Sequence, residues 1–145
     1  MDLVRRLLTL EAAGSRDQEA LIDAAERASD KLRAHLVKRI GQEGFRTLLA
    51  RALTLTTAQH PRLSAVRVGS DGALVGLRAA VSRGSEEARD DEALGGTLEG
   101  AMALVAQLLA LLITFIGEDL TLRLLNTVWP ELAPRDLTDQ ETERT

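Results

Sequence analysis

The sequence contains no cysteine, three aromatic residues and two histidines in 145 residues. The missing cysteines exclude disulfide bonds, thiolate metal sites and cysteine nucleophiles. His35 and His60 lie far apart, with no carboxylate or second histidine at ligand spacing, so we expect no metal site and no cofactor. Three aromatic rings are too few for a surface that stacks single-stranded bases.

Familiar catalytic motifs are also missing. The sequence has no glycine-rich phosphate loop, no G-x-S-x-G elbow and no H-E-x-x-H motif. Glu118 and Asp119 are adjacent, so on a helix they point about 100° apart and indicate a charged helix start rather than an acid/base pair. We therefore expect no catalytic residues and no enzyme activity. The N-terminal segment lacks the pattern of a secretory signal, which favours a cytoplasmic location.

The most distinctive stretch is an uncharged run from Ala101 to Ile116, in which only Gln107 and Thr114 are polar. A helix that is apolar on every side needs cover on every side, so we expect a central helix about 24 Å long. The run is just long enough to cross a membrane, but acidic residues flank it without basic or aromatic anchors. A core helix is therefore favoured, and whether part of it forms an interface stays open.

Apolar residues at helical spacing predict three helices before this run, over residues 3–10, 15–40 and 45–56. Gly14 is a plausible stop for the first helix. Ser15 and Gln18 have the spacing of a capping box that would start the second. Gly41 and Gly44 interrupt the pattern between the second and third. A last amphipathic helix is expected over 120–128, closed by Trp129 and Pro130.

The periodicity changes between residues 64 and 78, where short β-favouring runs flank Asp71-Gly72. This pair predicts a β-hairpin with a type I′ turn. The polar stretch from Ser82 to Glu92, including Gly84–Glu92, is either a loop or the first turns of the next helix. Residues 131–145 carry five acidic and two basic residues and little to bury, so we expect a disordered acidic tail.

Together these patterns predict a mainly α-helical single domain over residues 1–130. Four or five helices would pack around the central apolar helix at about 101–116, with one short β-hairpin at about 64–78. The order of helix, hairpin and Ala- and Leu-rich helix over residues 48–112 resembles the opening of a roadblock/LC7 domain. That family has further strands before its last helix, whereas residues 117–129 of this chain have a helical pattern.

Charge is unevenly distributed within the net charge of −4. Residues 1–60 carry +2 and residues 61–145 carry −6, and the segment from Arg27 to Arg51 holds seven basic residues and two acidic ones. This surplus supplies four anion-binding candidates: Arg27, Lys31, Lys38 and Arg39. Their spacing suits a phosphate backbone, although solvated helix faces carry the same pattern.

His35 offers a second possible use of this segment. The sequence Ala34-His-Leu-Val-Lys38 resembles a fragment of the histidine-phosphotransfer motif, in which a phosphorylated histidine lies on a bundle helix. Arg39 occupies the position where that motif has a glycine.

A large apolar core without site chemistry favours a non-catalytic protein–protein interaction module, such as an adaptor or a regulatory subunit. The interface candidates are Val66, Val68, Leu74 and Trp129, near the free edges of the predicted hairpin and the end of the last helix. The expected partner is another protein or a second copy of this chain in a homo-oligomer, rather than nucleic acid or a membrane. The alternative is an anion- or nucleic-acid-binding regulator that uses the basic helical face.

Overall fold

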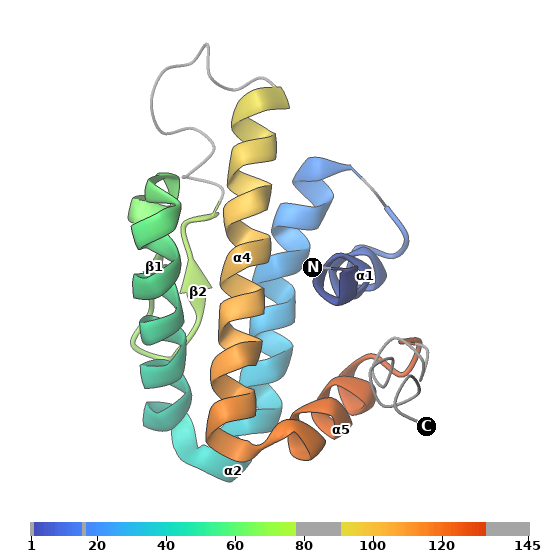
Figure 1. Ribbon diagram of the computed structural model, residues 1–145, viewed down its shortest axis with the longest axis vertical. Coiled ribbons are helices and arrows are strands. Elements are labelled where there is room, and N and C mark those ends of the chain that lie inside the picture. Colours follow the sequence, from blue (N-terminus) through green and yellow to red (C-terminus); the bar gives the residue numbers. More distant parts are fainter. Residues whose placement is uncertain (1, 16, 78–90, 133–145) are drawn as a thin grey trace.

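The computed structural model describes residues 2–15, 17–77 and 91–132 and is mainly α-helical. Its elements are, in chain order, α1 (Asp2–Glu11), α2 (Gln18–Gln59), the 3-10 turn η1 (Pro61–Ala65), β1 (Arg67–Val68), β2 (Leu74–Val75), α4 (Asp91–Ile116) and α5 (Glu118–Val128). α4 stands in the middle of the bundle beside the two limbs of α2 (Figure 1). The predicted fold class, a helical bundle around a central apolar helix with a small hairpin, is confirmed.

The central helix begins at Asp91, earlier than the predicted Ala101. It packs against α1, α2, η1 and α5. By length and composition its segment Gly95–Ile116 could cross a membrane, and the core helix of a soluble protein passes the same test. Of its most apolar window, 44% is buried inside the protein. Over residues 95–116 the exposed positions are Glu99, Ala110 and residues 113–115, so this part of α4 is least covered near its C-terminal end.

Two glycines bend the chain at the same end of the bundle (Figure 1). Gly41 (φ 81°, ψ 162°) divides α2 into a first limb, residues 18–40, and a second limb, residues 42–59. Gly117 (φ 94°, ψ 157°) separates α4 from α5. This backbone conformation is essentially restricted to glycine. The sequences Ile-Gly-Gln-Glu at 40–43 and Ile-Gly-Glu-Asp at 116–119 thus form similar helix–glycine–helix corners.

Small residues on α4 let η1 pack closely against it. A Cβ atom at Gly100 would lie 3.0 Å from Cγ of Leu63, and one at Gly96 would lie 2.9 Å from Nε of Arg62. Leu63 is fully buried in this contact. The two glycines therefore serve a close approach within the chain.

The predicted capping box at the start of α2 is wrong. The helix begins at Gln18, with Asp17 as the N-cap residue and no side-chain cap hydrogen bond. Oγ of Ser15 instead accepts a hydrogen bond from the backbone N–H of Asp17 at 3.1 Å. Ser15 therefore lies two residues before the N-cap residue, and its hydroxyl serves this local turn instead of the N3 amide of α2. Gly44, expected to interrupt the helix, lies inside the second limb.

The hairpin is confirmed but shorter than predicted, with Arg67 opposite Val75 and Val68 opposite Leu74. The predicted type I′ turn is wrong, because among its residues only Gly72 has a positive φ, at 88°. The connection has five residues, and the N–H of Gly72 donates to the carbonyl oxygen of Gly69 at 2.9 Å. Connections of this length are most often built around a type I turn, which needs no positive φ at Asp71.

The two short strands make a two-stranded sheet, and residues 118–128 are helical. Within the described residues the chain therefore lacks the further strands of a roadblock/LC7 domain. Of the polar stretch from Ser82 to Glu92, Asp91 and Glu92 are the first residues of α4, and residues 82–90 lie outside the described residues. Residues 133–145, most of the expected acidic tail, also lie outside the described residues. Leu132, inside the expected tail, is buried, and its N–H donates to the carbonyl oxygen of Trp129.

Candidate functional site

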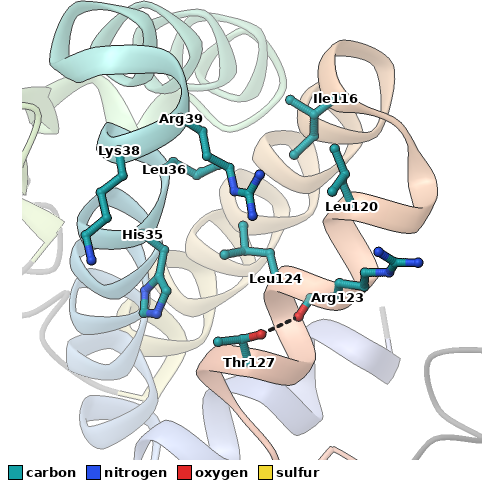
Figure 2. A pocket seen from close by; sticks show the side chains of 9 residues that line it. All are labelled: His35, Leu36, Lys38, Arg39, Ile116, Leu120, Arg123, Leu124 and Thr127. Atoms are coloured by element: carbon teal, nitrogen blue, oxygen red, sulfur yellow. Dashed lines mark hydrogen bonds between the residues drawn. The ribbon is translucent and has the colours of Figure 1, made fainter.

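A pocket of about 330 Å³ lies between the first limb of α2 and the junction of α4 with α5 (Figure 2). Its lining residues are His35, Leu36, Lys38, Arg39, Ile116, Leu120, Arg123, Leu124 and Thr127. Leu36 and Leu124 are buried and form an apolar floor. Lys38, Arg39 and Arg123 are exposed. The Arg39 side chain extends over this floor, whereas the side chains of Lys38 and Arg123 point away from it on either side (Figure 2). None of the nine lining residues is acidic, so no carboxylate of the lining offsets the charge of its basic side chains.

These three cations differ from most other basic side chains near them. Arg27 and Lys31 form ion pairs with Glu11, Arg33 with Asp30 and Arg46 with Glu43. The three cations of the pocket differ: in the part of the chain that the structure describes, no side-chain hydrogen bond or ion pair is made by Lys38, Arg39 or Arg123. Even Asp119, at the favourable i, i+4 spacing from Arg123, makes no ion pair with it in this part of the chain.

The helices that carry these cations explain part of their placement. Lys38 and Arg39 lie in the last turn before the bend at Gly41, where the helix dipole favours positive charge. Arg123 lies in the middle of α5, where the dipole offers no such benefit. Its backbone carbonyl accepts a hydrogen bond from Oγ1 of Thr127 at 2.8 Å. The local helix thus accounts for two cations of the pocket but not for the third.

The four anion-binding candidates named from the sequence separate into two pairs. Arg27 and Lys31 contact the carboxylate of Glu11 at 3.3 Å and 2.8 Å. Lys38 and Arg39 line the pocket. The spacing of these residues predicted one basic face. In the fold this face is divided, because Arg27 and Lys31 pair with Glu11 whereas Lys38 and Arg39 lie at the pocket.

Glu11 itself is nearly enclosed, with 5% of its side chain exposed. Burial opposes ionisation of this carboxyl and would raise its pKa. Hydrogen bonds from Lys31, Trp129 and Arg27, together with the charge of Lys31, outweigh burial and leave the pKa of Glu11 below the ordinary glutamate value. The Glu11 cluster is thus a satisfied ionic contact between α1, α2 and the end of α5.

The hairpin and C-terminal interface candidates lie mostly in the chain's own core. Val66, Leu74 and Trp129 are each 3–4% exposed, and Val68 is partly buried against the same core. Trp129 also donates from its indole Nε1 to Glu11. None of these four residues lines the pocket.

His35 lies at one side of the pocket and is partly exposed. Its Nδ1 is 3.0 Å from the carbonyl oxygen of Lys31, and because a carbonyl oxygen only accepts, Nδ1 carries the proton. Arg39 follows one helical turn later and lies at the pocket (Figure 2). The position at which the phosphotransfer motif has a glycine is therefore filled by the long side chain of Arg39.

Among the described residues, no group of three or more His, Asp or Glu side chains is placed to hold a metal ion.

Exposed apolar side chains adjoin the pocket at the bend between α4 and α5. Ile113 is 40% exposed, Phe115 61% and Leu120 38%. All three lie within four residues of Gly117, and we call them the Gly117 corner. Leu120 also lines the pocket, and Phe115 precedes Ile116, a second lining residue, whereas Ile113 and Phe115 themselves are not part of the lining.

Sequence reasoning missed Phe115, Leu120 and Arg123 as site residues. Phe115 belongs to the uncharged run and was expected in the core. The local signal at this position was Gly117, which ends α4 two residues after Phe115. Arg123 is far from Lys38 and Arg39 in the sequence, and only the tertiary structure places all three in the lining of one pocket. Comparison with known proteins finds no match, since no family model, no curated protein and no solved structure is significantly similar to this chain.

Proposed function

We propose that this protein is a non-catalytic module that binds another protein through the pocket and the Gly117 corner. The observation that carries the proposal is the exposure of Phe115. It is one of the chain's three aromatic residues, and it is 61% exposed, whereas Phe45 and Trp129 are buried. Aromatic residues are enriched at the centres of protein interfaces.

The distribution of exposed apolar residues supports this proposal. The described residues include five large hydrophobic side chains that are exposed, and three of them belong to the Gly117 corner. Scattered exposed hydrophobic residues are normal on a protein surface. These three lie within eight residues around one bend, and Phe115 is the most exposed of the five. The adjoining pocket adds a concave apolar floor that could receive a partner's side chain.

The residues of this region favour binding over catalysis. A nucleophile with a base and a third orienting group would be needed for covalent catalysis. His35 is the one residue of the pocket lining that commonly acts as a base, and its Nδ1 partner is a backbone carbonyl rather than a carboxylate. Thr127 uses its hydroxyl within α5. This lining is suited to holding a partner by shape, apolar contact and charge.

Site-specific photo-crosslinking in cells tests the proposal. A benzophenone amino acid would replace Phe115 in one variant and Leu55 in a control variant. Leu55 is a suitable control because it is also an exposed apolar residue, 39% exposed, but lies in the second limb of α2 and outside the pocket. We expect a discrete protein adduct from position 115 and none from position 55. The same adducts from both positions, or none from position 115, would contradict the proposal.

Light scattering during gel filtration identifies whether the partner is a second copy. A dimer of wild-type protein that becomes a monomer in Phe115→Ser would make the chain its own partner at this site. An adduct of foreign mass at position 115, with a monomeric purified protein, would make it an adaptor or regulatory subunit. Both results require the Gly117 corner to be an interface.

A further inference from the structure

We propose that the partner segment is acidic, with carboxylates that pair with the pocket's cations and an apolar side chain that covers its floor. This inference rests on the proposed function and names the chemistry of the partner. It follows from three features: cations without partners in the described chain, an apolar floor between them, and acidic residues at the neighbouring corner.

Charge complementarity gives the first argument. Lys38, Arg39 and Arg123 belong to the lining of one pocket, and the described residues provide no carboxylate to any of them. Arg39 lies over the pocket, with Lys38 and Arg123 on either side of it (Figure 2). An acidic segment that crosses the pocket can therefore bring carboxylates to cations both over the floor and at its edges. Two of the three are arginines, whose planar guanidinium groups pair with a carboxylate through two parallel hydrogen bonds. Figure 2 shows the Arg39 guanidinium between α2 and α5, above Leu124.

The apolar floor gives the second argument. Leu36, Leu120 and Leu124 line the same volume as the cations. An inorganic phosphate or a nucleic-acid backbone would satisfy the charges but leave this apolar surface in contact with water. The volume of about 330 Å³ lies at the lower end of the range for ligand pockets, about 300–1,000 Å³. An apolar side chain between acidic residues satisfies both parts of the pocket.

The acidic residues of the corner distinguish a peptide from an anionic membrane. Glu118 and Asp119 are exposed and lie between Phe115 and Leu120 in the chain. A flat anionic lipid surface that received Phe115 would approach these carboxylates as well and be repelled by them. A peptide of limited width can occupy the concave pocket and leave Glu118 and Asp119 in water. The geometry therefore favours an acidic protein segment.

Selection from a random peptide display library tests this chemistry while the partner is still unidentified. The full-length protein would be the bait, and the double variant Arg39→Gln/Arg123→Gln would remove peptides that bind elsewhere. We expect enriched peptides to carry at least two Asp or Glu residues around a Leu, Ile, Val, Met or Phe. Enrichment of basic or uncharged peptides, or no enrichment, would overturn the inference.

Fluorescence anisotropy would then measure an enriched peptide against matched variants. We expect Arg39→Gln and Arg123→Gln each to raise Kd by about tenfold, the scale of one charge-assisted contact. Arg51→Gln is the matched control, since Arg51 is an exposed arginine of α2 outside the pocket, and it should leave Kd within about twofold. The peptide with Gln and Asn in place of its acidic residues should bind at least about tenfold more weakly. Equal effects of Arg39→Gln and Arg51→Gln would overturn the inference.

Two further probes separate the other sources of negative charge. Inorganic phosphate and vesicles of phosphatidylserine with phosphatidylcholine should not compete with the peptide at matched total charge. Competition by vesicles, lost in Phe115→Ser, would replace the peptide with a membrane surface. A protein adduct at position 115 combined with selected peptides that are not acidic would leave the proposed function standing and refute only the acidic chemistry.

Discussion

The indole Nε1 of Trp129 donates a hydrogen bond to Oε1 of Glu11 at 3.0 Å, joining residues 118 positions apart in the sequence. The same carboxylate receives Lys31 at 2.8 Å and Arg27 at 3.3 Å. Glu11 is the last residue of α1, Arg27 and Lys31 lie in α2, and Trp129 follows α5 directly. One carboxylate thus connects three helices and fixes the end of α5, whose other residues form one wall of the pocket.

We expect Glu11→Gln to lower the free energy of unfolding by about 1–2 kcal/mol, because it removes the charge that Lys31 and Arg27 share. Trp129→Phe should cost a similar amount, since it keeps most of the buried ring and removes the N–H donor. Glu43→Gln is the control: its ion pair with Arg46 is largely exposed, and its loss should cost less than about 0.5 kcal/mol. Urea denaturation followed by circular dichroism measures all three. Equal losses in Glu11→Gln and Glu43→Gln would contradict the structural role of Glu11.

The lowered pKa of Glu11 predicts how this contribution depends on pH. The folded-state pKa lies below the ordinary value of 4.5, so the stabilisation is complete above that value and is lost as the pH falls through the folded-state pKa. The difference in unfolding free energy between wild type and Glu11→Gln should therefore be constant near neutral pH and shrink below about pH 4.5. Denaturation series for both proteins down to about pH 3 would show this. A difference that grows on acidification would have the wrong sign.

The helical elements were predictable because their signals are local. The uncharged run identified α4, apolar spacing identified α1 and α5, and Gly41 marked the bend in α2. Asp71-Gly72 placed the hairpin correctly, although the turn type depends on the length of the connection, which the sequence left undefined.

The candidate site was only partly predictable, because its residues come from three helices. Lys38 and Arg39 were named from the basic surplus, but the same surplus gave equal weight to Arg27 and Lys31. Only the folded chain shows that Arg27 and Lys31 form ion pairs with Glu11. Phe115 shared its composition with the buried part of α4, and its exposure depends on where neighbouring helices end. Local patterns therefore predicted the elements, while the site depends on how the elements pack.

The two glycine bends should resist substitution for a purely conformational reason. A Cβ atom at Gly41 or Gly117 would meet nothing within 4 Å, so steric clash plays no part. The backbone conformation at each is one that other residues rarely adopt, and alanine there should cost about 1–3 kcal/mol.

Gly95→Ala is the matched control for these bends, because Gly95 lies in helical backbone and its added methyl group would meet only the end of the Gln18 side chain, at 3.4 Å. This substitution should be neutral or stabilise the protein by up to about 1 kcal/mol. Thermal or urea denaturation distinguishes the two classes. Destabilisation by Gly95→Ala equal to that of Gly41→Ala would show that the bends are not special.

The chain's two phenylalanines provide a matched test that separates binding from stability. Phe45 is fully buried, and Phe45→Ala should lower the free energy of unfolding by about 3–5 kcal/mol because it leaves a cavity in the core. Phe115 is 61% exposed, and Phe115→Ala should change the unfolding free energy by less than about 0.5 kcal/mol. Urea denaturation of the two variants measures both values. If Phe115→Ala instead proved as destabilising as Phe45→Ala, the ring would belong to the core, and the Gly117 corner would lose the residue that makes it a binding surface.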